Sequence, residues 1–237
     1  MNTVRNYQKE LDKIIEELGA AAGCAPTLFL HSCCAPCSSY VLESLRQYFR
    51  ITVFYYNPNI TEDAEYRKRV EEQKRLIAAY NEMAAGQEVS PERARSGHHI
   101  EIVEGDYEPQ QFYEIAKGLE QCPEGGERCF ACYELRLRET AKRAQVGGFD
   151  YFTTTLSISP LKNAAKLNEI GERLAQEYNI PWLPSDFKKR DGYKRSIELS
   201  REYDLYRQDY CGCVYSKVKG KLRSILLICR YQKKDCG

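Results

Sequence analysis

Three short cysteine clusters are the residues of this chain whose types and spacing best suit chemistry. They are Cys33-Cys34-Ala35-Pro36-Cys37, Cys129-Phe130-Ala131-Cys132 and Cys211-Gly212-Cys213. Deprotonated cysteines bind zinc or iron–sulfur clusters, and four of them complete such a site. The spacing leaves three interpretations open: a structural zinc site, a reactive metal or cluster site, and simple burial of the thiols.

The first two clusters together provide four thiolates, from Cys33, Cys34, Cys129 and Cys132. Adjacent cysteines seldom form a disulfide with each other, because the small ring strains the peptide between them. Both can still be ligands where a turn splays their side chains. Zinc ribbons usually place each C-x-x-C on a small turn, whereas the first cluster here follows an apolar strand. This position favours a reactive site over structural zinc.

The third cluster places one glycine between Cys211 and Cys213. A C-x-C segment can close a small, strained disulfide, and strained disulfides are the ones most easily reduced. In a reducing compartment the C-G-C sequence therefore predicts either a redox pair or two metal ligands.

The cysteine count and the first residues indicate the expected compartment. Eleven is an odd number, so the cysteines cannot all be paired, and the N-terminal sequence has no apolar stretch followed by small residues. We expect a cytoplasmic protein without a disulfide framework. The longest apolar run near either end, 225–229, is too short to span a bilayer. We expect Cys24, Cys229 and Cys236 only to pack, and Cys122 to be a bystander.

Apolar strands alternate with helices along the chain. The expected strands are 27–32, 51–57, 100–104, 151–155 and 180–183, and the expected helices are 1–22, 38–49, 61–85, 109–119, 129–144, 161–178, 191–206 and 214–229. This alternation predicts an α/β fold with a mostly parallel sheet flanked by helices. We expect one domain over 1–237, with an N-terminal helix at 1–22 and a basic helical C-terminal part at 186–237.

Ligands of such sheets bind beyond the carboxyl ends of the strands. The first cysteine cluster leaves the first strand there, and Thr153-Thr154-Thr155 at the end of the fourth strand could line the same crevice. His31 precedes the cluster inside a strand, so we expect a buried imidazole. His98 and His99 lie in a polar loop and are expected at the surface. The chain contains no P-loop, G-x-G-x-x-G or G-x-S-x-G motif.

The charge distribution is uneven. Residues 186–237 contain 14 Lys and Arg against 7 Asp and Glu, and residues 1–185 contain 21 against 27. A basic C-terminal part on an acidic body indicates either an anionic partner or a set of solvated lysines.

Five segments in this order resemble the QueH family of epoxyqueuosine reductases. They are HSCCAPCSSYVLESL, YNPNI with the following Glu65-Tyr66-x-x-Arg69, RCFACYELRL, FTTTLSISPLKN and LYRQDYCGCVYS. The resemblance runs from about residue 28 to 216. It implies a Rossmann-like fold of the HUP type, with the cysteine loop where related pyrophosphatases keep a phosphate loop.

The resemblance further implies two-electron reduction of the epoxide of epoxyqueuosine, at the tRNA wobble position, to give queuosine. A [4Fe-4S] cluster would be held by Cys33, Cys34, Cys129 and Cys132. Cys211 and Cys213 match a redox-active disulfide. Some members have Asp at the position of Cys37, which leaves open whether Cys37 binds an additional iron ion or is dispensable. The electron donor is not identified.

The basic C-terminal part then has an expected partner in the anticodon loop, whose bases can be splayed out of the stack. Phosphate contacts would come from Lys188, Lys189, Arg190, Lys194, Arg195, Arg207, Lys217, Lys219 and Arg223. Tyr193, Tyr206 and Tyr210 could stack on bases or fill the core, and we expect at least half of them in the core.

Two alternatives stay open. One is an ATP-dependent enzyme that inserts sulfur into tRNA, which the missing phosphate loop disfavours. The other is a zinc-stabilised nucleic-acid-binding module without catalysis. The proton donor to the leaving oxygen is also open, with Asp106, Asp186 and Asp209 as candidates.

Overall fold

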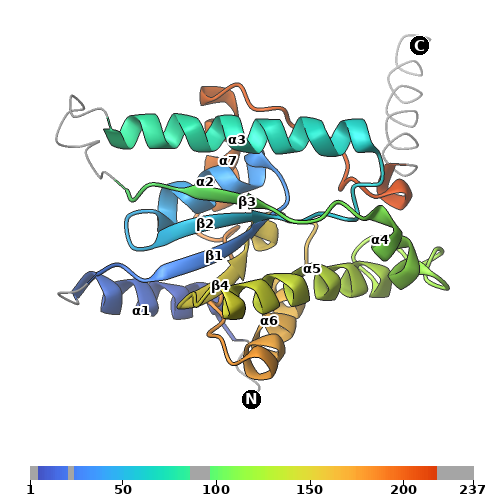
Figure 1. Cartoon of the computed structure of the whole chain (residues 1–237), viewed down its shortest axis with the longest axis horizontal. Helices are drawn as coiled ribbons and strands as arrows, with labels where there is room; N and C mark the ends of the chain where they lie inside the picture. The colour runs from blue at the N-terminus through green and yellow to red at the C-terminus, as the bar shows by residue number, and fades with distance from the viewer. Residues whose placement is uncertain (1–4, 21–23, 86–96, 218–237) are drawn as a thin grey trace, which may run out of the picture.

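Four parallel strands form the centre of the structure, a computed structural model that describes residues 5–20, 24–85 and 97–217. They are β1 (Thr27–Ser32), β2 (Arg50–Tyr55), β3 (Glu101–Glu104) and β4 (Tyr151–Thr154). Their order across the sheet is β3-β2-β1-β4 (Figure 1). The parallel pairing confirms the predicted α/β fold, which is Rossmann-like.

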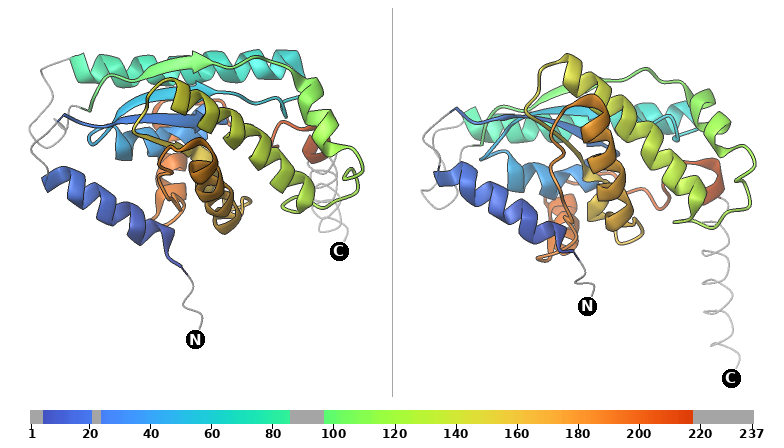
Figure 2. Two further views of the ribbon diagram at one scale, coloured as in Figure 1. Left: turned by 60° about the horizontal axis from the view of Figure 1, so that its bottom comes forward. Right: turned by 90° about the horizontal axis from the view of Figure 1, so that it is seen from below.

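Helices cover both faces of this sheet (Figures 1 and 2). Their bounds are α1 (Tyr7–Ala20), α2 (Ala35–Leu45), α3 (Asp63–Ala85), α4 (Pro109–Ala116), α5 (Glu127–Val146), α6 (Ala164–Tyr178) and α7 (Gly192–Glu202), and the 3-10 turn η1 spans Thr155–Ile158. None of the helices within the described ranges combines the length and the apolar character needed to cross a bilayer.

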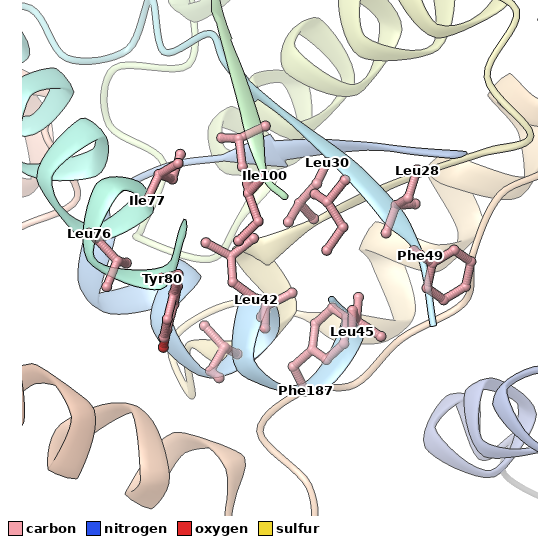
Figure 3. Packing of buried hydrophobic residues seen from close by; sticks show 14 of the residues in the cluster. Leu28, Leu30, Leu42, Leu45, Phe49, Leu76, Ile77, Tyr80, Ile100 and Phe187 are labelled. Carbon is pink, nitrogen blue, oxygen red and sulfur yellow. The ribbon is translucent and has the colours of Figure 1, made fainter. Parts of the chain in front are cut away.

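Successive side chains of β1 point to opposite faces of the sheet and pack into two different hydrophobic cores. Leu28 and Leu30 pack among side chains of α2 and α3 (Figure 3), whereas Phe29 between them packs against the α5 and α6 layer. Successive residues of a strand point to opposite faces, so a strand buried on both faces must be apolar throughout. The few charges in β1 and β2 thus reflect a three-layer α/β/α arrangement.

The helix α1 docks on the first of these cores, as predicted for the N-terminal helix. Leu11 is buried there, and Ile14, Ile15 and Leu18 pack against the same cluster. This spacing of three and four residues puts one apolar face of the helix against the protein.

Several predicted element bounds differ from the structure. Residues 180–183 do not form a fifth strand; only one bridge, between Phe152 and Trp182, continues the sheet on that side. The chain runs straight from α6 into a buried turn, where Trp182 is fixed by its indole N–H donating to Asn168 Oδ1 at 2.9 Å. The predicted helix 214–229 has only its first turn, 214–217, among the described residues.

The carboxyl ends of β1, β2 and β4 meet at one edge of the sheet. The chain leaves β1 towards β2 on one side, while β4 lies on the other side of β1, so the order reverses between β1 and β4. Such a reversal opens a crevice at the carboxyl ends of the strands. The first cysteine cluster follows β1 and η1 follows β4, so both border this crevice.

Candidate active site

The loop between β1 and α2 brings three thiols together. The sulfurs of Cys33, Cys34 and Cys37 all lie within 4.8 Å of one another, and those of Cys33 and Cys34 are 3.8 Å apart. Cys34 is the extended N-cap residue of α2, and Pro36 occupies the first turn, where its missing N–H costs no helical hydrogen bond. Among the described residues this is the one group of three metal-ligating side chains found at such close range.

These thiols cannot all ionise without a compensating cation. Contact with Cys33, and then with Cys37, lowers the pKa of the Cys34 thiol well below its ordinary value. The contact with Cys34 raises the pKa of Cys33 to about 11, and contact with Cys33 raises the pKa of Cys37 as well. These shifts favour ionisation of Cys34 before Cys33 and Cys37, and a bound metal would favour loss of the remaining protons.

Buried polar contacts hold this loop in place. His31 is fully buried, with Nδ1 2.8 Å from Thr154 Oγ1 and Nε2 3.1 Å from the Tyr56 carbonyl. Burial lowers the pKa of His31 to about 3, so the imidazole is neutral. Asn57 Nδ2 donates to the Ser32 carbonyl at 2.8 Å. The prediction of a buried, satisfied His31 is confirmed.

The second cluster begins α5. The Gly125 N–H donates to Cys129 Sγ at 3.2 Å, while Cys132, one turn later, is buried. Burial raises the pKa of the Cys132 thiol to about 12. Cys132 also packs with Cys213 and Phe112, so the second and third clusters share one small core.

The C-G-C turn depends on its glycine. Gly212 has a φ of +109°, and a Cβ there would lie 2.7 Å from the Ile60 side chain. The Thr61 N–H donates to the Gly212 carbonyl at 3.3 Å, which ties this turn to the segment before α3. Cys211 is half-buried and Cys213 is buried, with its sulfur 3.4 Å from Ser216 Oγ.

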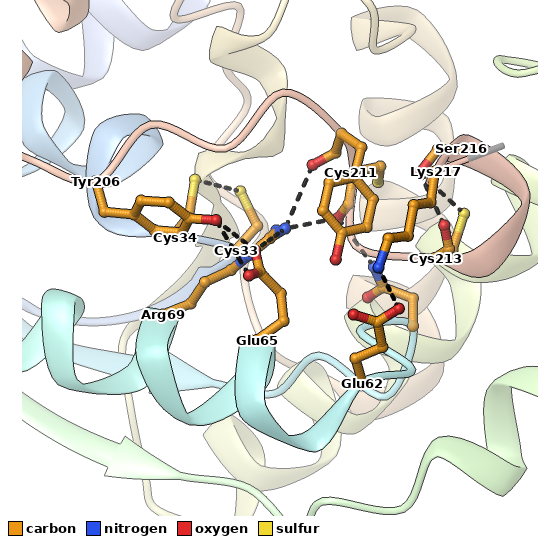
Figure 4. A network of polar contacts seen from close by, with 12 residues as sticks. Cys33, Cys34, Glu62, Glu65, Arg69, Tyr206, Cys211, Cys213, Ser216 and Lys217 are labelled. Carbon is orange, nitrogen blue, oxygen red and sulfur yellow. Dashed lines mark hydrogen bonds and ion pairs between the residues drawn. The ribbon is translucent and has the colours of Figure 1, made fainter. Parts of the chain in front are cut away.

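A buried ion pair on α3 holds the same turn (Figure 4). The side chain of Arg69 is 2% exposed and lies 2.6 Å from the Glu65 carboxylate. Its remaining N–H groups donate to the carbonyls of Cys211 and Tyr210 at 3.3 and 3.4 Å. The Tyr206 hydroxyl donates to Glu65 Oε2 at 3.1 Å. One helix thus fixes the backbone on which Cys211 sits.

Two hollows connect the three clusters. The larger, a cleft of about 290 Å³, is lined by Cys33, Cys37 and Cys211 among others. The smaller, about 10 Å³, is lined by Cys129, Cys132, Cys211 and Cys213 among others. Two cationic side chains, those of Arg136 and Lys162, line both hollows. Cys211 also lines both, so the clusters border one continuous region.

Arg136 is buried in this region without a carboxylate partner among the described residues. Its Nε donates to the Cys132 carbonyl at 3.3 Å and its Nη1 to Asn57 Oδ1 at 3.2 Å. Its Nη2 has no hydrogen-bond partner. The groups whose ionised forms would interact favourably with this guanidinium are thiols, chiefly Cys132, Cys211 and Cys33. A buried cation beside thiols suits an anionic sulfur centre.

Of the four predicted cluster ligands, the structure places Cys33 and Cys34 in one group and Cys129 and Cys132 in another. Cys33 and Cys34 lie with Cys37, whereas Cys129 and Cys132 lie with the C-G-C turn across Arg136. Cys122 is half-buried, and its carbonyl accepts from Arg128 Nη1 at 2.7 Å. The prediction that Cys24 packs is wrong, because it is exposed before β1. Cys229 and Cys236 lie outside the described residues.

The predicted phosphate-contacting residues divide into two groups. Lys188, Arg190, Arg195 and Lys217 form ion pairs with Asp186, Asp12, Glu43 and Glu62. Lys189, Lys194 and Arg207 are exposed and make no ion pair within the described ranges, while Lys219 and Arg223 lie outside them. The first group is held to the protein surface, and the second is available to an anion.

The tyrosines and histidines of the sequence analysis are also placed. Tyr193 and Tyr210 line the larger cleft, and Tyr193 is 37% exposed. Tyr206 is half-buried, so none of the three fills the core and that part of the expectation is wrong. His98 and His99 are exposed, as expected.

Of the candidate proton donors, only Asp209 lines the cleft. Asp106 is 76% exposed and pairs with Arg143, and Asp186 pairs with Lys188. Sequence reasoning missed Arg136 and Lys162 as site residues. Two features of the sequence could have indicated them. Lys162 lies in the S-P-L-K-N segment, and Arg136 lies four residues, or one helical turn, after Cys132.

Comparison with known proteins identifies the family of this chain. A family model described as "Epoxyqueuosine reductase QueH" matches residues 28–219. A relative of that name from Staphylococcus epidermidis is 44% identical over 216 residues, 90% of this chain and 85% of the relative. One from Streptococcus pyogenes is 39% identical, covering 91% and 81%, and one from Thermotoga maritima is 32% identical, covering 80% and 90%. The chain therefore belongs to the QueH family of epoxyqueuosine reductases.

Proposed function

We propose that this chain reduces the epoxide of epoxyqueuosine in tRNA to the alkene of queuosine, in the cleft at the carboxyl ends of β1 and β4. The observation that carries the proposal is the meeting of all three cysteine clusters around this cleft in a chain of the QueH family. Removal of the epoxide oxygen as water consumes two electrons and two protons. The cleft therefore has to provide a redox centre, a proton source and room for a modified base.

The residues fit a thiolate-bound metal cofactor. The grouped thiols of the β1–α2 loop need a cation to ionise together, and the unpartnered Nη2 of the buried Arg136 favours negative charge nearby. We assign Cys33, Cys34, Cys129 and Cys132 as the residues that would hold a [4Fe-4S] cluster, with Cys37 beside them for an additional iron ion. A bound cluster would supply electrons one at a time.

Cys211 and Cys213 are proposed to form the redox pair. Both are thiols in the structure, and the glycine between them allows the tight turn that a C-x-C disulfide needs. Cycling between dithiol and disulfide would store two electrons next to the substrate cleft, because Cys211 lines that cleft.

The tRNA would be met by the face around α7. Lys189 and Lys194 flank the start of this helix, and Arg207 lines the cleft itself. Exposed cations without acidic partners contact phosphates with little desolvation cost. Tyr193, at the cleft and partly exposed, is placed to stack on a splayed base. A cytoplasmic location is part of the same proposal.

The test is turnover of anaerobically purified protein with epoxyqueuosine-containing tRNA and a low-potential reductant, read as queuosine by nucleoside mass spectrometry. We expect queuosine without added ATP, together with iron and acid-labile sulfide in the protein. Turnover that requires ATP would indicate sulfur insertion or another reaction. Zinc as the sole metal, with no queuosine formed, would indicate a binding module and refute the proposal.

A matched pair of variants localises the activity. Cys34→Ser removes the thiol whose ionisation the loop favours most, and we expect it to lose metal and activity together. Cys24→Ser changes an exposed thiol far from the cleft and should retain both. Equal loss in the two variants would show that the metal is held elsewhere.

A further inference from the structure

Lys162 is a buried cation whose nearest side-chain partner is a sulfur. It lies between η1 and α6 with a side chain that is 8% exposed. Its Nζ is 3.2 Å from Cys211 Sγ, within hydrogen-bond range, and 3.9 Å from the Glu124 carboxylate. A lysine is seldom buried unless it is paired, so this position requires an explanation.

The surroundings keep this lysine charged. Burial by itself would lower the pKa of Lys162, but the Cys211 sulfur and then the Tyr133 hydroxyl outweigh burial and raise the pKa above its ordinary value. The other charged groups facing the ammonium are Arg136, which opposes the charge, Cys129 and Glu124. The Nζ–Sγ distance of 3.2 Å lets the ammonium donate to the Cys211 sulfur.

The two sulfurs of the C-G-C turn are not equivalent. Cys211 lines the substrate cleft and contacts Lys162, whereas Cys213 lines only the smaller hollow and lies against Ser216. Burial raises the pKa of the Cys213 thiol. The pair therefore consists of one half-buried sulfur beside Lys162 at the cleft and one buried sulfur beside Ser216.

We propose that Lys162 pairs with the Cys211 thiolate and is the acid that donates a proton to the epoxide oxygen. The inference rests on the proposed reductase function. It replaces Asp106 and Asp186, which do not line the cleft, and Asp209, which lines the cleft but makes no hydrogen bond to a cysteine sulfur among the described residues. Lys162 lines the cleft and touches a reacting sulfur, so its proton is available where the carbon–oxygen bonds break.

The proton and electron count closes with this assignment. When the Cys211 thiolate and the Cys213 thiol become a disulfide, they release two electrons and one proton. Lys162 provides the second proton and becomes the neutral amine, which burial favours once Cys211 is part of a disulfide and no longer holds the ammonium charge in place. The epoxide takes up both electrons and both protons, its two carbon–oxygen bonds to the bridging oxygen break, and the products are an alkene and water. An external low-potential reductant then returns two electrons, with two protons from solvent, to the disulfide and the amine.

Two variants separate the pairing role from the proton-donating role. Lys162→Gln removes both the charge and the proton. Lys162→Arg keeps a cation beside Cys211, but the guanidinium does not give up a proton. Lys166→Gln is the matched control, since Lys166 is a nearby half-buried lysine on α6 that pairs with Glu169 and does not line the cleft.

The first measurement is the alkylation rate of Cys211 by iodoacetamide, followed by peptide mass spectrometry on anaerobic, phosphine-reduced protein of matched iron content. At pH 7 we expect Lys162→Gln to slow Cys211 alkylation at least tenfold, with rates converging near pH 10. Lys162→Arg and the Lys166→Gln control should stay within about threefold of the wild type. If Cys211 of the Lys162→Gln variant is alkylated at the wild-type rate across this pH range, the pairing is wrong.

The second measurement is single-turnover formation of queuosine. General acids contribute about 10²- to 10⁴-fold, so Lys162→Arg should lose at least 100-fold in rate while its Cys211 still alkylates normally. Wild-type turnover by Lys162→Arg would overturn the proton assignment. If the wild-type protein itself forms no queuosine, the proposed function fails, and the alkylation result still decides the pairing separately.

Discussion

Replacement of Arg69 by methionine is expected to release the C-G-C turn from α3 and to destabilise the protein by about 3 kcal/mol. The substitution keeps a long apolar stem but leaves the Glu65 carboxylate, 12% exposed, without its cation. It also removes the donors to the carbonyls of Cys211 and Tyr210. Breaking a buried pair from one side costs about 3–5 kcal/mol, and the lower end applies because Tyr206 still donates to Glu65.

The double variant Arg69→Met, Glu65→Gln removes the stranded charge as well. We expect it to recover about 2 kcal/mol of the loss, because the remaining cost is that of the two carbonyl hydrogen bonds. Arg67→Met is the matched control on the same helix. Its pair with Asp63 is exposed, with Arg67 at 73%, so the free energy of unfolding should match that of the wild type.

Two assays distinguish loss of the turn from global destabilisation. Urea unfolding of metal-free protein measures the free energy of unfolding, and amide hydrogen exchange over 208–216 measures local opening. Arg69→Met should accelerate exchange in this segment more than in β1. If the single variant unfolds within 1 kcal/mol of the wild type and exchange at 208–216 is unchanged, then Arg69 does not hold the turn.

Three further outcomes follow from the structure. Asp150 accepts from the N–H and hydroxyl of Thr27 at 2.8 and 2.7 Å, so Asp150→Ala should lose about 1 kcal/mol by urea unfolding at pH 7. The Thr27 N–H lowers the pKa of Asp150. The difference in free energy of unfolding between the wild type and Asp150→Ala should therefore be complete above about pH 4 and should shrink as the pH falls. A difference that grows in acid would contradict this. Charge reversal at Lys189 and Lys194 should weaken tRNA binding and lower its salt dependence by about two units of slope, measured by filter binding at several salt concentrations; an unchanged slope would place the tRNA elsewhere. Gly212→Ala puts a Cβ 2.7 Å from Ile60 at a φ of +109° and should abolish queuosine formation while iron content is retained, whereas iron loss would mean that the turn also holds the metal.

The local patterns of the chain were sufficient for the fold class and the motifs. Apolar strands alternating with amphipathic helices permit few arrangements other than a parallel sheet between helix layers, because the central strands β1 and β2 are buried on both faces. The same patterns could not define element ends. The segment 180–183 is apolar enough for a strand, but it forms a single bridge to β4, in which the Pro181 carbonyl and the Leu183 N–H bond to the backbone of Phe152.

The cysteine spacing by itself determined which residues could carry chemistry, because ligand type and loop position are properties of the sequence. It did not decide how those residues meet. The tertiary structure places Cys37 with Cys33 and Cys34, and it puts the C-G-C turn next to Cys132 from 79 or more residues away in the chain. Arg136 and Lys162 read as ordinary surface cations on helices until packing buries them. Burial depends on contacts between distant segments, and the electrostatics of the site, which follow from burial, could therefore be read only from the folded chain.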